Sequence, residues 1–342
     1  MNTLTRIIFV LAIITSSCDI IRDEPDLLIP EGRGIFILNE GNYLAGNGSL
    51  SFYSFETEEI YDNLFSVKNE RPLGDIPVFM AVDNNRAFII VNNSGTIEVI
   101  DLTTMQSLAT VTGISSPRRM VIHGRRGYVS SLQSDKITIL DLDNLTVTGT
   151  IDIGCNSEAM IISGNRLFAA NWAGGNKIVV ADLTDNTIEA SITTGLEPES
   201  MVLDRNNRLW VLCTGGYMNE EIPSIIKINA STLAVEDEMA FRTVSDNPSS
   251  LVINSGGDTL YYIDEGVRRM PVAMTSLPED VMIEPGGRLF YKLAASPWNG
   301  RIMVTDAIDF QQKGDLLIYD RKGLLIDSKQ CGIIPGFMCF KY

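Results

Sequence analysis

The stretch that decides the fold is "PRRMVIHGRRGYVSSLQSDKITILDLDNLTVTGTIDIG", residues 117–154. It contains four short runs in which apolar and polar residues alternate, and turns rich in Gly, Asn, Asp and Ser separate them. Alternation with a period of two predicts β-strands, and such turns predict hairpins between consecutive strands. The stretch therefore predicts a four-stranded antiparallel meander.

The same pattern recurs along the chain. Three further stretches align with it, at residues 77–113, 157–195 and 198–241, and weaker units follow as far as residue 329. A methionine near the start of each of the four clear units recurs at steps of 40, 40 and 41 residues; these are Met80, Met120, Met160 and Met201. Units of this length that cannot bury both faces alone are typical of β-propellers, in which they pack radially.

The two ends of the chain predict how the ring closes. The N-terminal stretch from "GIFILNEGN" to "EEIYDNLF" supplies only the second, third and fourth strands of a unit. The last eight residues, "PGFMCFKY" (335–342), repeat the Pro-x-x-Met opening that a first strand shows elsewhere. We therefore predict an all-β fold, a seven-bladed β-propeller of four-stranded antiparallel blades, in which the C-terminal strand joins the N-terminal blade. This closure leaves no long unpaired sheet edge.

The N-terminus reads as a targeting segment. One basic residue in "MNTLTR" precedes the apolar run "IIFVLAII" and then "TSSC", which predicts a signal peptide over residues 1–17. The small residues before Cys18 resemble a bacterial lipobox, although Thr15 stands where Leu is preferred, and an ordinary secreted protein is the alternative. We predict lipidation at Cys18, an acidic tether over 18–32 that resembles the surface-export signal of Bacteroidota lipoproteins, and a propeller over 33–342. This implies a lipid anchor in the outer membrane and exposure at the cell surface.

Charge and composition exclude some partners. The net charge of −16 disfavours nucleic acid and anionic membrane surfaces, because both need clustered Lys and Arg. The hydrophobic fraction of 45% is large enough for an extensive core. The cysteines show no C-x-x-C spacing, so a zinc site is poorly supported, and Cys213 and Cys339 read as small buried apolar residues.

Catalytic candidates are few. His123, the only histidine, occupies a predicted turn position, so neither a Ser-His-Asp triad nor a histidine-ligated metal site can be assembled. Four aspartates end third strands and are expected to cap the following turns: Asp101, Asp141, Asp182 and Asp320. Glu158 and Glu199 occupy equivalent positions in adjacent units, so a carboxylate pair remains open. We expect no enzyme, no catalytic residue, no metal and no cofactor.

The repeat predicts which loops share a face. We call "top face" the face that carries the loops entering each first strand and the loops joining second and third strands. Irregular loops with aromatic, Asn and Gly residues gather there in the prediction, which is typical of a binding surface. Arg118 and Arg119 enter the same face beside acidic neighbours. The candidate ligand-binding residues are Asn39, Glu40, Asn42, Tyr43, Asn92, Arg118, Glu158, Asn171, Trp172, Glu199, Tyr217, Asp264, Trp298 and Asn299. The alternative for Trp172 and Trp298 is that they fold back as loop plugs.

The chain resembles the YncE-like seven-bladed propellers, and more closely the BtuG branch of surface lipoproteins of Bacteroidota. The resemblance rests on "GIFILNEGN" (34–42), "LGDIP" (73–77), strands of the "IEVIDL" type (97–102) and "GIIPGFMCF" (332–340). It implies a non-enzymatic lipoprotein that captures cobalamin or another corrinoid and passes it to a TonB-dependent outer-membrane transporter. Two other functions stay open: a protein-interaction scaffold, and an enzyme of the lactonase kind known among related propellers.

Overall fold

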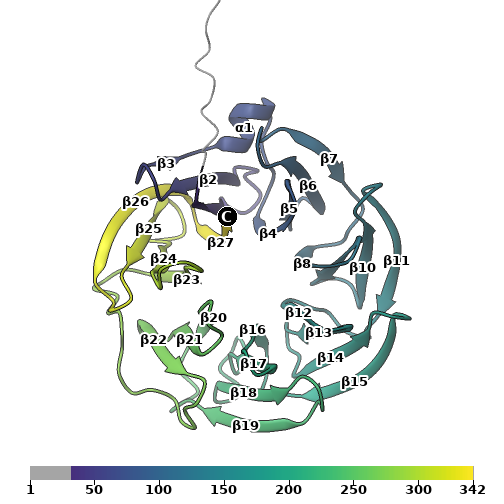
Figure 1. The fold of residues 1–342 in the computed structure, drawn as a ribbon, viewed down its shortest axis with the longest axis vertical. Helices are drawn as coiled ribbons and strands as arrows, with labels where there is room; N and C mark the ends of the chain where they lie inside the picture. The colour runs from purple at the N-terminus through teal and green to yellow at the C-terminus, as the bar shows by residue number, and fades with distance from the viewer. Residues whose placement is uncertain (1–31, 342) are drawn as a thin grey trace, which may run out of the picture.

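The structure is a computed structural model that describes residues 32–341. The predicted signal peptide, the lipidation site at Cys18 and all of the tether except its last residue lie outside the described residues. Within them, seven antiparallel sheets stand in a ring around a common axis (Figure 1). The prediction of a seven-bladed propeller is confirmed.

Every blade begins with an inner strand at the axis, and its other strands follow outward in order. Blade 1 contains β27 (Pro335–Lys341), β1 (Gly34–Asn39), β2 (Ser49–Ser54) and β3 (Ile60–Tyr61). Blade 2 contains β4 (Pro77–Asp83), β5 (Arg86–Val91), β6 (Thr96–Asp101) and β7 (Ser107–Val111). Blade 3 contains β8 (Pro117–His123), β9 (Arg126–Ser131), β10 (Lys136–Asp141) and β11 (Thr146–Asp152). Blade 4 contains β12 (Met160–Ser163), β13 (Arg166–Asn171), β14 (Lys177–Asp182) and β15 (Thr187–Thr193).

The remaining blades continue the same order. Blade 5 contains β16 (Pro198–Leu203), β17 (Arg208–Cys213), β18 (Ser224–Asn229) and β19 (Val235–Ala240). Blade 6 contains β20 (Ser249–Ile253), β21 (Thr259–Ile263) and β22 (Val267–Pro271). Blade 7 contains β23 (Phe290–Ala295), β24 (Ile302–Asp306), β25 (Lys313–Tyr319) and β26 (Leu325–Ile333).

The ring closes through β27, as the chain ends predict. β27 pairs antiparallel with β1, and Met338 lies opposite Ile37. Asn39, at the end of β1, is fully buried, and its Oδ1 accepts a hydrogen bond of 3.0 Å from the backbone N–H of Gly332. Its Nδ2 donates to Ser51 Oγ at 2.8 Å. Asn39 therefore fastens the C-terminal segment to blade 1.

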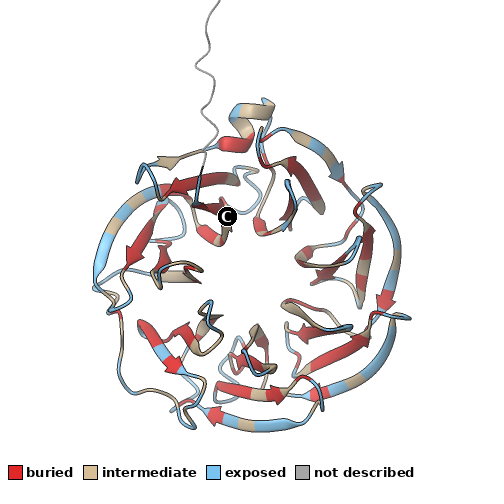
Figure 2. Cartoon of the chain, viewed as in Figure 1, coloured by how far each residue is buried: buried red, intermediate tan, exposed pale blue. Residues whose placement is uncertain are grey.

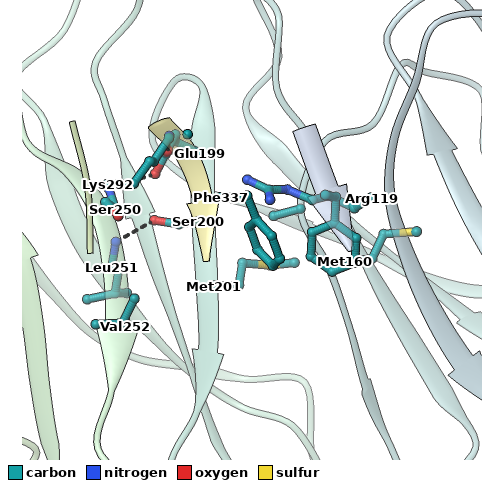
Figure 3. Close-up of a pocket in the computed structure, with 13 residues that line it drawn as sticks. Arg119, Met160, Glu199, Ser200, Met201, Ser250, Leu251, Val252, Lys292 and Phe337 are labelled. Atoms are coloured by element: carbon teal, nitrogen blue, oxygen red, sulfur yellow. Dashed lines mark hydrogen bonds and ion pairs between the residues drawn. The ribbon is translucent and has the colours of Figure 1, made fainter. Parts of the chain in front are cut away.

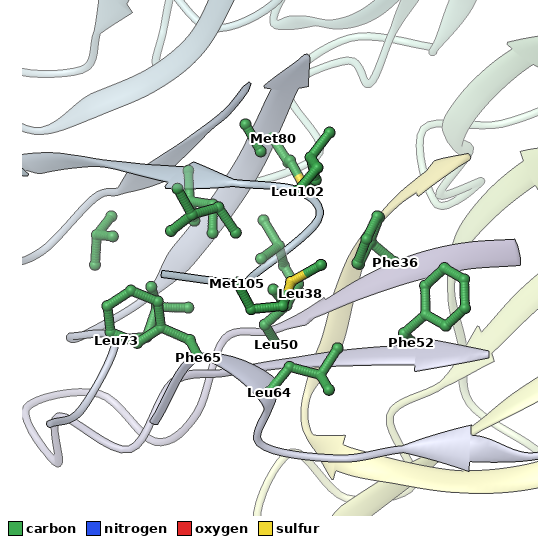
Figure 4. Close-up of a cluster of buried hydrophobic side chains, with 14 residues drawn as sticks. Phe36, Leu38, Leu50, Phe52, Leu64, Phe65, Leu73, Met80, Leu102 and Met105 are labelled. Carbon is green, nitrogen blue, oxygen red and sulfur yellow. The ribbon is translucent and has the colours of Figure 1, made fainter. Parts of the chain in front are cut away.

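The core lies between neighbouring blades. Buried residues concentrate in the second and third strands of the blades, the strands at the axis are mostly intermediate, and the outermost strands carry many exposed residues (Figure 2). Between blades 1 and 2, Phe36, Leu50 and the repeated Met80 pack with Phe65 (Figure 4). Met120 is buried in the same way between blades 2 and 3. The methionine thus recurs because it packs between neighbouring blades, where a flexible apolar side chain fills the space well.

Blade 6 departs from the prediction of four strands in every blade. Its sheet has three strands in the described chain, and residues 272–289 pass where a fourth would lie, held by one isolated bridge between Val267 and Ile283. Pro278 and Pro285 lie in this segment and cannot donate to a strand ladder. A short helix, α1 (Leu64–Asn69), between blades 1 and 2 was also not predicted; it buries Leu64 and Phe65 in the core.

Several residues lie where the sequence predicts a structural role. The four aspartates at the ends of third strands accept hydrogen bonds from turn N–H groups, as Asp101 does from Thr104 at 2.8 Å. His123 ends β8 on the face opposite the top face. Cys213 is buried between blades 4 and 5, and Cys339 packs between blades 1 and 2. In the part of the chain that the structure describes, no helix is long and apolar enough to cross a membrane.

Candidate functional site

The top face gathers most of the predicted site residues. Each first strand begins there, and each loop between second and third strands turns there. The following predicted residues lie on this face: Asn39, Glu40, Asn42, Tyr43, Asn92, Arg118, Glu158, Asn171, Trp172, Glu199, Tyr217 and Asp264. They come from six of the seven blades, so the ring brings together residues that are far apart in the sequence.

The predicted placement of Trp298 and Asn299 on the top face is wrong. Their loop joins β23 to β24, the first and second strands of blade 7, and therefore turns on the opposite face. There Trp298 packs edge-on against Phe55 and Phe340, with ring centroids 5.8 and 5.4 Å away. The length of this hairpin made it resemble a loop between second and third strands.

The innermost part of the top face is a cluster of charged side chains, which we call the axial cluster. It comprises Glu40, Arg118, Arg119, Glu158, Glu199, Tyr291 and Lys292. They stand at the entrance of first strands or, for Glu40, in the loop after β1. The cluster contains three carboxylates and three cationic groups, so its formal charges cancel.

Glu158 is the most heavily bonded carboxylate of the cluster. It is buried, and Arg118 donates to its two oxygens from Nε at 2.5 Å and from Nη2 at 3.1 Å. Burial alone would lower the pKa of Arg118, but the charge and hydrogen bonds of Glu158 raise it. Arg119 adds a weaker ion pair, with 3.5 Å between its Nε and Glu158 Oε1. Two charge-assisted hydrogen bonds in a buried site hold such a pair rigidly in one geometry.

Glu199 and Lys292 form the second ion pair. Lys292 Nζ lies 3.1 Å from Glu199 Oε1, and the backbone N–H of Ser250 donates to Oε2 at 3.1 Å. Burial would raise the pKa of Glu199, but the charge of Lys292 and the hydrogen bonds from Ser200 and Lys292 outweigh it and hold the pKa at about 2. Glu199 is therefore ionised at neutral pH and does not act as a proton donor.

Glu40 differs from the other two carboxylates. Its Oε1 accepts a hydrogen bond of 2.8 Å from the hydroxyl of Tyr291. Burial raises the pKa of Glu40 despite that hydrogen bond and the charges of Lys292, Arg118 and Arg119. Burial and the neighbouring Glu40 also raise the pKa of Tyr291 well above its usual range. Glu40 thus takes up a proton more readily than Glu199 does.

A pocket opens beside the axial cluster (Figure 3). Its volume is about 190 Å³, and a smaller pocket of about 70 Å³ shares Arg119, Lys292 and Phe337 with it. Both charged and apolar side chains line it: Arg119 stands beside Phe337, and Glu199 and Lys292 lie across from it (Figure 3). The apolar lining residues are Phe79, Met160, Met201, Leu251, Val252 and Phe337. The combination suits a small molecule with one apolar and one polar end.

Trp172 folds back rather than standing free. Its ring is half-buried, and the guanidinium carbon of Arg118 lies 6.0 Å from the ring centroid. The turn after it is held by Glu197, whose Oε1 accepts from the backbone N–H of Gly174 at 3.0 Å. Trp172 therefore packs against the Arg118 guanidinium with its ring partly withdrawn from solvent, in line with the plug alternative.

Three further predicted residues use their polar groups within the protein. Asn92 Nδ2 donates to the carbonyl of Pro117 at 3.0 Å, and Asn171 Nδ2 donates to the carbonyl of Asn156 at 3.2 Å. Asn42 is tied into its own loop, because its backbone N–H donates to Asn47 Oδ1 at 2.8 Å. The side-chain amides of Asn39, Asn92 and Asn171 thus help to position the loops.

Exposed apolar side chains surround the axial cluster on two sides. We call them the rim: Tyr43, Leu44, Tyr217, Met218, Ile308 and Phe310. Tyr43 and Leu44 are 70% and 74% exposed, and Tyr217 is 89% exposed. The loops of blades 1 and 7, which are neighbours in the ring, carry one group, and the loop of blade 5 carries the other (Figure 1).

Asp264 lies apart from the axial cluster, on blade 6. It is buried and forms an ion pair with Arg268, with 3.3 Å between Asp264 Oδ2 and Arg268 Nη2. Arg268 also donates from Nε to the backbone carbonyl of Asp264 at 3.1 Å. Burial raises the pKa of Asp264 in spite of Arg268. The pair lines a pocket of about 270 Å³ together with residues 276–279 of the segment that follows β22.

The sequence predictions missed Tyr291, Lys292, Phe79 and Phe337. The signal that could have found two of them lies in the repeat itself. Phe79 and Phe337 stand directly before the repeated methionine position of a first strand, and Arg119 occupies the same position in blade 3. Residues at that position turn toward the axis, so each unit presents one of them to the site.

The comparison with protein families identifies the group to which the chain belongs. Residues 33–285 match the family described as "Domain of unknown function (DUF5074)". This chain is a member of the DUF5074 family. The match covers more than half of the chain and reaches from blade 1 into the segment after blade 6. No curated protein matches this DUF5074 member.

Solved structures similar to this DUF5074 protein share its fold at low identity. A quinonprotein alcohol dehydrogenase-like protein from Bacteroides thetaiotaomicron is 15% identical with a TM-score of 0.72, covering 91% of this chain and 79% of that one. A protein from Lactobacillus plantarum is 12% identical with a TM-score of 0.68, covering 91% and 100%. A putative 6-phosphogluconolactonase from Bacteroides fragilis is 13% identical with a TM-score of 0.65, covering 91% and 99%. Some of these names denote enzymes and others do not, so the likeness supports the propeller fold and no activity.

Proposed function

We propose that this DUF5074 propeller captures a large, amide-rich ligand such as a corrinoid on its top face and does not transform it. The observation that carries the proposal is the contrast on this face between charges that are already paired and apolar side chains that are exposed. A wide ligand without strong charge can cover the axial cluster and leave no ion pair broken. Its apolar flanks then contact the rim.

The size of the pocket decides how such a ligand is held. A volume of about 190 Å³ is below the range of roughly 300–1,000 Å³ that encloses drug-sized ligands. A corrinoid is larger still, so it would lie across the face and contact the loops of blades 1 and 5. Tyr43 and Tyr217 offer flat amphipathic plates at those two places.

The cellular setting belongs to the same proposal. Lipidation at Cys18 would tether the propeller to the outer membrane, and a TonB-dependent transporter would receive the ligand from the top face. The acidic surface fits a protein that contacts the membrane only through its lipid, because a net charge of −16 is repelled by anionic headgroups.

Calorimetric titration with cyanocobalamin tests the proposal. The protein is residues 19–342, which keep every blade and omit the lipidated cysteine. We expect saturable one-to-one binding without any change in the ligand. Leu44→Ala should weaken it, while Leu324→Ala, at a residue 66% exposed on the opposite face, should not. Absence of binding, or an equal effect of both variants, would contradict capture on the top face.

A protein partner is a second candidate, because Tyr217 and Met218 protrude together from the long loop of blade 5. Exposed aromatic and methionine side chains of this kind serve as anchors in protein interfaces. A titration that gives no heat with cyanocobalamin, together with loss of transporter binding in Tyr217→Ala, would favour this function over ligand capture.

A further inference from the structure

Arg119 holds an unusual position in the axial cluster. Its guanidinium carbon lies 5.1 Å from the ring centroid of Phe79 and 5.5 Å from that of Phe337. The two rings contact each other, with centroids 4.5 Å apart. The two phenyl rings come from β4 and β27, and Arg119 from β8, so three blades fix the guanidinium over an apolar platform. A guanidinium on aromatic faces is held in place without losing its hydrogen-bond donors.

The donors of Arg119 are largely unused. Its Nε forms the ion pair of 3.5 Å with Glu158, whose two oxygens Arg118 already occupies. Among residues 32–341, no group accepts a hydrogen bond from its two terminal nitrogens. Arg119 is nonetheless mostly buried, with a side chain that is 20% exposed. A rigid guanidinium with free terminal nitrogens is suited to a planar oxyanion, above all a carboxylate.

The pocket in front of Arg119 has a matching apolar wall. Arg119 extends into the pocket toward the side of Glu199 and Lys292, while Met160, Met201 and Phe337 lie beside it (Figure 3). The volume of about 190 Å³ exceeds the roughly 150 Å³ of an engineered apolar cavity that binds benzene. The space therefore accommodates a body of about one six-membered ring together with a carboxylate.

We propose that the pocket beside the axial cluster binds a small carboxylate with an apolar body. The terminal nitrogens of Arg119 hold the carboxylate, and the side chains of Met160 and Met201 hold the apolar body. This site lies below the surface that a corrinoid would cover, and the inference stands whether or not the top face binds one. It assigns to the DUF5074 propeller an anionic small-molecule ligand that the repeat alone would not indicate.

The charge balance of the axial cluster is consistent with such a ligand. Arg118, Arg119 and Lys292 face Glu40, Glu158 and Glu199, so the arriving carboxylate adds one negative charge. Burial raises the pKa of Glu40, and its protonation would restore neutrality with the ligand bound. Benzoate binding should therefore strengthen as the pH falls toward the raised pKa of Glu40, as long as benzoate itself stays ionised.

The direct test compares benzoate with benzamide, its neutral isostere, by calorimetric titration of residues 19–342. We expect saturable binding of benzoate and at least about tenfold weaker binding of benzamide, because a charge-assisted hydrogen bond contributes about 1.5–3 kcal/mol. This comparison needs no altered protein, so it does not depend on the folding of a variant. Equal binding of the two compounds, or no saturable binding of benzoate, would overturn the inference.

Variants locate the site. Arg119→Met keeps an apolar contact with Phe79 and Phe337 and should weaken benzoate binding by about tenfold or more. Arg125→Met is the matched control, because Arg125 is an exposed arginine paired with Asp143 on the opposite face. Glu40→Gln should bind benzoate more tightly at pH 8 and lose the pH dependence. Unchanged affinity in a folded Arg119→Met protein would contradict the assignment.

The test separates this site from the corrinoid proposal. Benzoate binding with no response to cyanocobalamin would leave the carboxylate site standing and remove the capture of a corrinoid. Binding of cyanocobalamin without binding of benzoate would support the capture of a corrinoid and remove the carboxylate site. If both bind, Arg119→Met should reduce the affinity for benzoate more than the affinity for cyanocobalamin.

Discussion

The axial cluster and the rim lie on the same face, but they differ in burial, in charge and in the elements that carry their side chains. The axial cluster consists of buried or half-buried polar and charged groups at the start of first strands, with Glu40 in the loop after β1, and partners from other blades fix them. The rim consists of exposed apolar side chains on loops between second and third strands. Strands position groups accurately and loops tolerate change. The centre of this face is therefore built for precise polar contacts and the edge for adaptable apolar ones.

Removing the closing strand should have the largest effect, because it destroys both regions together. Deletion of residues 335–342 removes β27, opens the edge of β1 and takes Phe337 from the pocket beside the axial cluster. We expect a protein that does not fold cooperatively, measured by circular dichroism during heating. A soluble truncated protein with an unchanged melting temperature would contradict closure of the ring through this strand.

Breaking the buried ion pair comes next. Glu158→Ala leaves Arg118 buried without its partner, which should cost about 3–5 kcal/mol in the free energy of unfolding. Glu189→Ala removes the partner of Arg166 in a more exposed pair and should cost about 1 kcal/mol or less. Urea denaturation measures both. Similar losses in the two variants would mean that the axial cluster is no more rigid than the protein surface.

Acid should weaken the axial cluster over a defined range. The pKa of Glu199 is about 2 in the folded protein against 4.5 for the free group, so the ionised form is stabilised by folding. Its contribution, about 3 kcal/mol, is complete above pH 4.5 and is lost as the pH falls toward 2. A Glu199→Gln/Lys292→Met double variant should show a flatter fall in stability across this range. An unchanged pH profile would contradict the pairing of Glu199 with Lys292.

The rim should have the smallest effect on stability. Leu44→Ala and Leu324→Ala remove similarly exposed side chains from opposite faces, and each should change the free energy of unfolding by less than about 0.5 kcal/mol. Their stabilities should match, so a difference in ligand binding between them reports on the surface alone. A large destabilisation by Leu44→Ala would show that the rim is part of the core.

The repeat made the architecture predictable, but it did not predict which contacts each side chain forms. Spacing of the methionines and the Pro-x-x-Met start of "PGFMCFKY" predicted the blades and the closure, because every blade must bury the same positions. The prediction of four strands was wrong for blade 6, because an irregular segment replaces its fourth strand. The prolines of this segment cannot donate the backbone hydrogen bonds of a strand.

The candidate site shows where prediction from the repeat ends. Trp298 was predicted on the wrong face, because a long hairpin between first and second strands resembles a top-face loop in the sequence. Asn39, Asn92 and Asn171 were placed on the correct face, yet their amides bond to the protein. Lys292 was missed because its partner, Glu199, lies 93 residues away and only the closed ring brings them together.

Hydrogen exchange with and without cyanocobalamin tests the central claim most directly, because it reports which face the ligand covers. We predict slower exchange in the top-face loops 40–48 and 214–223 when the ligand is present, and no change in the opposite turn 123–126. Protection confined to the opposite face, or no protection at a saturating ligand concentration, would contradict capture on the top face.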